Sequence, residues 1–226
     1  MLVVKDIPKA RTTTDIVFDQ LREDILSLKI LPGTKISEAE VATRMGVSRQ
    51  PVRDAFNRLE HLDLLSIRPQ RATTVRGFSK QKIANARFVR MSIELEVMRC
   101  AHEVWDTSKA EALEQNLSIQ GDAISSGKVN NFHALDYEFH KLIFDQCGHD
   151  LAFEMIVACK QQVDRLCMLS LTNAKEVTHV FEDHVRIADA LSGKSASKLE
   201  TLLREHLGRL DTTIQNIEKI HADYFE

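Results

Sequence analysis

Apolar residues recur at helical spacing in three short stretches near the start of the chain. The first covers residues 13–30 and is stopped by a Pro-Gly pair. The second begins with Ser37 and Glu40, which are spaced as in a capping box, and ends at Gly46. The third follows Ser48, which has the side chain of a good N-cap. Two short helices joined by a tight turn that contains glycine predict a helix-turn-helix.

The pattern then changes to a β-hairpin. Residues 64–67 and 73–75 are β-prone runs, and the segment between them, Arg68-Pro69-Gln70-Arg71, is short and basic. Two such strands directly after a helix-turn-helix are typical of a wing. We therefore expect a winged helix-turn-helix domain over residues 12–77.

From residue 79 onward the sequence shows long helical periods with few breakers, and the last proline of the chain is Pro69. The pattern predicts an all-α antiparallel helical bundle over residues 79–224, so the fold class of the whole chain is mainly α. The helices are expected at about 79–105, 108–126, 131–147, 150–171, 175–192 and 195–223.

Charge is divided unevenly between these two parts. Residues 1–78 carry 13 Lys or Arg against 10 Asp or Glu (+3), whereas residues 79–226 carry 17 against 23 (−6). The small N-terminal part is therefore the basic one, which favours a nucleic-acid partner for that part. No run of about 18 apolar residues occurs, and residues 1–11 lack the features of a cleaved signal, so we expect a cytoplasmic protein without a membrane segment.

The candidate DNA contacts lie on the second helix of the helix-turn-helix, whose first residues reach base edges in the major groove. Arg49 and Arg53 are four apart on one face, and Arg can donate two hydrogen bonds to guanine. Seven arginines and no lysine lie between residues 44 and 76, which favours planar, bidentate recognition over diffuse charge. The competing interpretation is that these arginines coat a solvated helix and loop, but their order with the caps and the wing favours DNA binding. The predicted DNA-binding residues are Arg44, Ser48, Arg49, Gln50, Arg53, Arg68 and Arg71.

The stretch from Leu31-Pro-Gly-Thr-Lys-Ile-Ser-Glu through Val47-Ser-Arg-Gln-Pro-Val-Arg-Asp-Ala-Phe resembles the DNA-binding domain of the GntR family of bacterial regulators. The resemblance spans about residues 12–77. It implies that Ser48, Arg49, Gln50 and Arg53 contact DNA and that the wing lies at residues 68–74. Ala72 is a departure, because the family usually has a glycine near the wing tip, and the resemblance therefore supports the helix contacts more strongly than the wing contacts.

A second constellation lies in the predicted bundle. Asp136 and His140 are four apart, so on a helix both side chains project from the same face and can bind one metal ion. His184 and His206 lie in two later helices, and antiparallel packing would bring them to the same depth. One Asp and three His suit Zn²⁺, with Ni²⁺ or Mn²⁺ as alternatives. The competing interpretation is four ordinary core or surface residues.

Residues from about 80 to 222 resemble the FCD ligand-binding domain of the FadR subgroup of the GntR family. In metal-containing members an Asp-x-x-x-His pair and a His in each of two later helices hold the ion, and these positions match Asp136, His140, His184 and His206. The resemblance implies that the metal leaves coordination positions open for the carboxylate of a small organic-acid effector. Arg90 is the first candidate partner of that carboxylate and Arg165 the second. Some segments also resemble regulators of sugar-acid catabolism, which implies a sugar acid or related hydroxy acid.

These observations predict a DNA-binding transcription regulator, a repressor, that responds to such an effector. Its bundles are expected to pair as a homodimer, because two-fold protein symmetry matches double-stranded DNA with an inverted-repeat operator. One alternative is a metal-dependent hydrolase or lyase that uses the Asp/His cluster, although the sequence has no HExxH motif, nucleophile elbow or phosphate-binding glycine loop. Another alternative is a scaffold protein that does not touch DNA.

Overall fold

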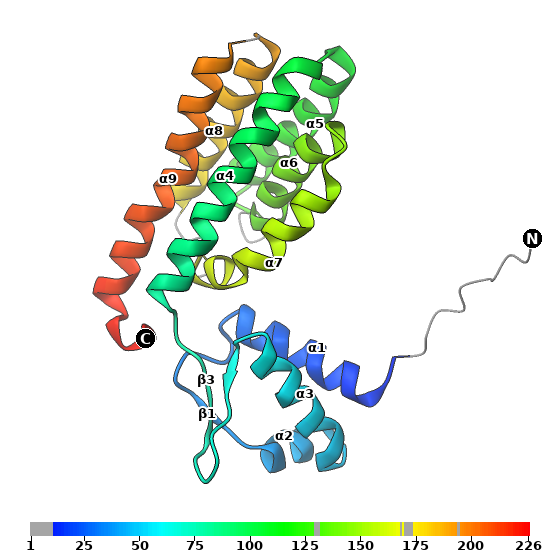
Figure 1. Cartoon of the computed structure of the whole chain (residues 1–226), viewed down its shortest axis with the longest axis vertical. Coiled ribbons are helices and arrows are strands. Elements are labelled where there is room, and N and C mark those ends of the chain that lie inside the picture. The colour runs from blue at the N-terminus through cyan, green and yellow to red at the C-terminus, as the bar shows by residue number, and fades with distance from the viewer. Residues whose placement is uncertain (1–10, 129–131, 168, 170–173, 194) are drawn as a thin grey trace, which may run out of the picture. The chain divides into compact units, whose positions relative to one another are not determined.

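The computed structural model describes residues 11–128, 132–167, 169, 174–193 and 195–226. The chain divides into two compact units, residues 1–77 and residues 78–226, and each is described by itself (Figure 1). Among the described residues, no helix combines the length and the apolar character that a transmembrane span requires.

The N-terminal unit is a winged helix-turn-helix, as the sequence predicts. The helices α1 and α2 pack against α3, and the three-stranded antiparallel sheet has the order β1-β3-β2. The strand β1 was not predicted; it pairs Lys35 with Thr74 and Ile36 with Thr73. The elements are α1 (Thr13–Leu26), β1 (Lys35–Ile36), α2 (Glu38–Met45), α3 (Arg49–His61), β2 (Leu65–Ser66) and β3 (Thr73–Val75).

Local capping explains where the helices of this unit begin and end. The hydroxyl of Ser37 accepts a hydrogen bond from the Glu40 N–H at the start of α2, and Gly46 ends that helix in the left-handed region with φ of 66°. The helix α1 ends four residues earlier than expected. Leu28 has a φ of 61°, and the Ile30 N–H donates to the Asp24 carbonyl, so the chain turns before the Pro-Gly pair.

The C-terminal unit is the predicted helical bundle. In it α4 packs against α7 and α9, and α5 packs against α6 and α8 (Figure 1). Most observed boundaries differ by one residue from those expected; α9 ends three residues early and is followed by a short 3-10 turn, η2. The expected end of α7 at 171 lies outside the described residues. The elements are α4 (Lys80–Val104), α5 (Thr107–Ser125), α6 (Phe132–Gln146), α7 (Asp150–Cys167), α8 (Ala174–Ser192), α9 (Ala196–Ile220) and η2 (Ala222–Tyr224).

The first residue of this unit is fixed by the last residues of the chain. The Phe78 N–H donates to the Tyr224 carbonyl at 2.7 Å, and the Glu226 N–H donates to the Phe78 carbonyl at 3.0 Å. The rings of Phe78 and Phe225 lie 5.5 Å apart, and Phe78 is fully buried. The segment before α4 is therefore part of the packed core of the bundle.

We predict that Gly46→Ala lowers the free energy of unfolding of the N-terminal unit by about 1 kcal/mol, because only glycine adopts this left-handed conformation without cost. A Cβ at Gly46 would meet no atom within 4 Å, so the effect would be conformational and not steric. Chemical denaturation followed by circular dichroism measures it.

Gly208→Ala is the control, because Gly208 lies inside α9, has no positive φ, and its added Cβ also has open space. There the same substitution should stabilise by roughly 0.5–1 kcal/mol, since alanine is the better helix former. Equal effects of the two substitutions would contradict this explanation.

Candidate functional sites

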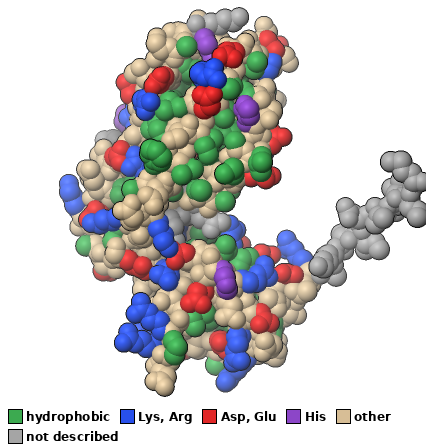
Figure 2. All heavy atoms as spheres, viewed as in Figure 1, with side chains coloured by type: hydrophobic (Ala, Val, Ile, Leu, Met, Phe, Trp, Pro, Cys, Tyr) green, Lys and Arg blue, Asp and Glu red, His purple; other side chains and the backbone are tan. Residues whose placement is uncertain are grey.

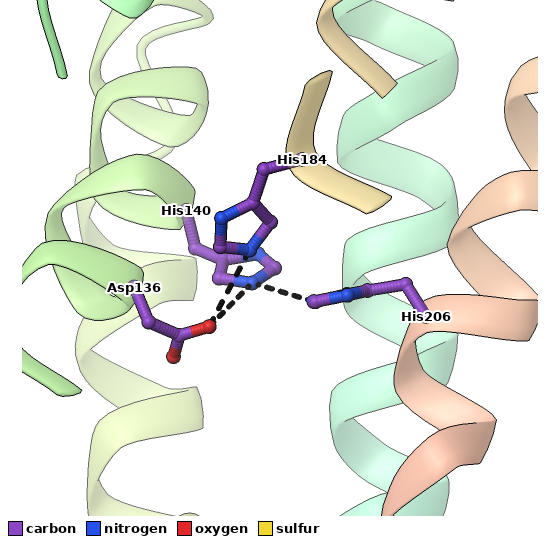
Figure 3. A group of neighbouring side chains, drawn as sticks. All are labelled: Asp136, His140, His184 and His206. Carbon is purple, nitrogen blue, oxygen red and sulfur yellow. Dashed lines mark hydrogen bonds and ion pairs between the residues drawn. The ribbon is translucent and has the colours of Figure 1, made fainter. Parts of the chain in front are cut away.

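Four side chains from three helices meet inside the bundle (Figure 3). Asp136 and His140 come from α6, His184 from α8 and His206 from α9, and one potential ligand atom of each lies within 4.8 Å of the others. The Nε2 atoms of His140 and His206 are 3.2 Å apart. The Nε2 atom of His184 is 3.4 Å from Oδ1 of Asp136, and Nε2 of His140 is 3.9 Å from the same oxygen. The sequence-predicted ligand set is therefore brought together.

Each histidine also has an oxygen beside its other ring nitrogen. His184 Nδ1 is hydrogen-bonded to Gln120 Oε1 at 2.9 Å. His140 Nδ1 lies 2.9 Å from Glu94 Oε2, and His206 Nδ1 lies 3.6 Å from Asp183 Oδ2. An oxygen at Nδ1 favours the tautomer with the proton there, so the Nε2 lone pairs face one another.

These three partners were not predicted from the sequence. Glu94, Gln120 and Asp183 belong to three different helices, α4, α5 and α8. Asp183 directly precedes His184, but it contacts His206 on the neighbouring helix. Such contacts depend on how the helices pack, which no local sequence signal records.

Burial keeps the three imidazoles neutral. All three histidines are buried, and loss of solvent lowers the pKa of His140, His184 and His206, because the charged ring is poorly solvated there. The adjacent carboxylates oppose this effect only in part. Neutral imidazole is the form that coordinates a metal ion.

The two arginines predicted to bind an effector occupy different places. Arg90 belongs to the cluster: its Nη2 lies 3.2 Å from His140 Nε2, and its Nε donates to Glu94 Oε1 at 2.5 Å. Burial alone would lower the pKa of Arg90, but the carboxylates of Glu94 and Asp136 raise it, so the guanidinium stays charged. Arg165 is fully buried and lies 5.0 Å from the Phe78 ring centroid. Burial lowers its pKa to about 10, and the charge of Glu226 partly offsets that effect.

The DNA-facing candidates begin at the N-terminus of α3. Ser48 is the N-cap residue, but its hydroxyl makes no capping hydrogen bond, and Arg49 is exposed without an ion pair to any described residue. Gln50 donates to Asp54 at 3.1 Å, and Arg53 is paired with Glu38. Ser48 and Arg49 are therefore the groups with most freedom to meet a ligand.

The other arginines divide into two groups. Arg44 lies 3.9 Å from Asp24, Arg58 pairs with Asp15, and Arg76 pairs with Asp63. Arg68 and Arg71 are exposed in the turn between β2 and β3. Figure 2 shows Lys and Arg side chains at the end of this unit where that turn and α2 lie.

A winged helix-turn-helix followed by a helical bundle with a buried polar cluster is the architecture of a DNA-binding transcription regulator. Comparison with known families supports this class. Residues 13–75 match the gntR family of bacterial regulatory proteins, and residues 86–209 match the FCD domain.

Individual relatives agree. The chain is 34% identical over 209 residues to the HTH-type transcriptional repressor RspR of Escherichia coli K12, with 92% of each chain covered. The solved structure of E. coli McbR/YncC has the same fold, with a TM-score of 0.69 at 21% identity over 91% of this chain and 99% of that one. A GntR regulator structure from Rhodococcus sp. RHA1 gives 0.68 at 20% identity, covering 89% and 96%.

The protein belongs to the GntR family of bacterial transcription regulators and carries an FCD domain. Members of this family bind DNA and small-molecule effectors. The matching family and the named relative are transcription regulators, so the hydrolase or lyase interpretation is wrong. The interpretation as a scaffold without DNA contact is wrong for the same reason.

Proposed function

We propose that the protein is a homodimeric repressor that releases its operator when a small carboxylate binds a metal ion in the bundle. One observation supports the metal and effector site. Three histidine Nε2 atoms converge on Asp136, while the Nδ1 atom of each ring faces an oxygen. Repression is inferred from the relative RspR, which is named a repressor.

The donor set fits a divalent transition metal. The Nε2 atom of His184 is buried, lies 3.4 Å from Oδ1 of Asp136 and makes no hydrogen bond with a described residue, and the neutral Nε2 atoms of His140 and His206 face each other. A cation between these lone pairs would bind the Nε2 atom of His184 and would remove the repulsion between the Nε2 atoms of His140 and His206. Three imidazoles and one carboxylate favour Zn²⁺, with Ni²⁺ or Mn²⁺ as alternatives. Asp136, His140, His184 and His206 would hold the ion, which supplies a positive charge and open coordination positions.

Arg90 supports an anionic effector at this site. Its guanidinium lies within 3.2 Å of a ligand nitrogen, so a carboxylate bound at the metal would meet two positive charges. We infer that the effector is a sugar acid or a related hydroxy acid. Arg165 remains a second candidate, although it contacts Phe78 and feels the charge of Glu226.

Pairing of two chains is supported by apolar side chains on the outside of the bundle. Phe88 of α4 is 74% exposed, and Leu151 and Met155 of α7 are 71% and 55% exposed. Figure 2 shows hydrophobic side chains gathered on one face of this unit. Such surfaces are typically covered by a partner. A two-fold dimer would present two copies of α3 to an inverted repeat, with half-sites about 10 base pairs apart.

Elemental analysis should find about one divalent ion per chain of untagged protein.

We predict that Gln120→Met weakens metal binding roughly 10- to 100-fold, because His184 loses the acceptor that fixes its ring. Competition against a chromophoric chelator measures the affinity for Zn²⁺. Gln115→Met is the control, since Gln115 is exposed on the same helix. A chain that binds no Zn²⁺, Ni²⁺ or Mn²⁺ would refute the metal proposal.

Arg90→Lys should weaken binding of the effector by at least about tenfold, because lysine keeps the charge but loses the planar pair of donors. Thermal-shift screening against sugar acids and dicarboxylates, with and without chelator, identifies the effector class, and calorimetry gives its affinity. Arg99→Lys on the exposed side of α4 is the control. Stabilisation that survives the chelator would place the effector elsewhere.

Arg49→Ala should reduce affinity for the operator by roughly tenfold or more, since one bidentate base contact is worth about 1–3 kcal/mol. The operator is obtained by selection from random double-stranded DNA, and fluorescence anisotropy measures binding at fixed salt. Arg99→Ala removes the same charge from the other unit and should have no such effect. Wild-type protein that selects no inverted repeat would argue against the proposed mode of binding.

A further inference from the structure

One ion pair joins the two helices of the helix-turn-helix. Nε of Arg53 on α3 donates to Oε1 and Oε2 of Glu38 on α2, at 3.3 and 3.2 Å, and Nη2 of Arg53 donates to Oε2 at 3.1 Å. The two residues are fifteen positions apart, so the pair crosses the turn between the helices. The carboxylate therefore holds one whole edge of the guanidinium.

The remaining donors of Arg53 form a second usable edge. A guanidinium has five N–H groups in a fixed plane, and the pair with Glu38 takes the edge formed by Nε and one hydrogen of Nη2. The other hydrogen of Nη2 and those of Nη1 are left, and no described residue accepts from Nη1. Nη1 and Nη2 together match N7 and O6 of guanine in the major groove. The ion pair thus leaves the guanine-matching end available.

The position of Glu38 needs an explanation, because a carboxylate on a surface that meets DNA is repelled by phosphates. Glu40, two residues further on, carries the same charge in the first turn of α2 and has no arginine partner among the described residues. Arg49, the other arginine at the start of α3, has no carboxylate partner in the part of the chain that the structure describes. Where the starts of α2 and α3 meet, the pairing therefore joins Glu38 to Arg53 and leaves out their charged neighbours Glu40 and Arg49.

We propose that Glu38 is a positioning residue for base recognition. It fixes the guanidinium of Arg53 and so sets the base preference at one position of the operator. This inference rests on the proposed contact between Arg53 and DNA. Holding the side chain before binding reduces the conformational freedom that is lost on the DNA and restricts the guanidinium to one orientation.

The test uses the full chain, the selected operator, and every single-base replacement in one half-site. Glu38→Ala should lower affinity for the operator by about fivefold, as expected for one side chain that is no longer held. It should also flatten the preference at the same base pair at which Arg53→Ala flattens it. In the Arg53→Ala background, Glu38→Ala should cause no further loss at that pair.

Two further variants serve as controls. Glu40→Ala removes the same charge from the same turn and should leave every base preference unchanged. Glu38→Gln keeps the size and one acceptor oxygen and should fall between wild type and Glu38→Ala. Circular dichroism at the binding temperature checks that each variant is folded.

The proposal is overturned if Glu38→Ala binds operator and random DNA more tightly alike, with base preferences intact, because Glu38 would then be only a repelling charge. It is also overturned if Arg53→Ala changes no base preference, since there would be no contact to position. That second result is distinguishable from failure of the proposed DNA-binding mode, in which the wild-type chain selects no operator and Arg49→Ala has no effect.

Discussion

Three histidine rings are neutral inside a packed helical bundle because burial lowers their pKa, and a side-chain oxygen beside Nδ1 of each orients the ring. These oxygens come from α4, α5 and α8, while the rings themselves come from α6, α8 and α9. The polar cluster therefore ties five of the six long helices of the unit to one small volume. Without those contacts, each ring would be a buried polar group with no fixed orientation.

The same arrangement makes the bundle responsive to charge. Glu94 is buried, and although burial would raise the pKa of its carboxyl, Arg90 and His140 hold that pKa well below its ordinary value. Asp183 is kept ionised in a similar way by His206, Arg209 and Arg186, against the effect of burial. Adding a cation or an anion to this balanced set changes the forces on several helices at once.

Features that are local in sequence were predictable, and those that depend on packing were not. The ends of α2 follow from Ser37 and Gly46, and the grouping of Asp136, His140, His184 and His206 follows from helical spacing and family resemblance. The two-residue strand β1 has no pattern of its own and exists because β3 pairs with it. Likewise Gln120 and Asp183 carry no signal that links them to a histidine on another helix.

Both neighbours of Gly77 are held by backbone hydrogen bonds. The Arg76 N–H donates to the Leu64 carbonyl in the first unit, and the Phe78 N–H donates to the Tyr224 carbonyl in the second. Gly77 is the single residue between these two hydrogen-bonded positions. Because Tyr224 and Glu226 follow directly after α9, which also carries His206, a displacement of that helix would strain the backbone hydrogen bonds that hold Phe78 at the start of the bundle.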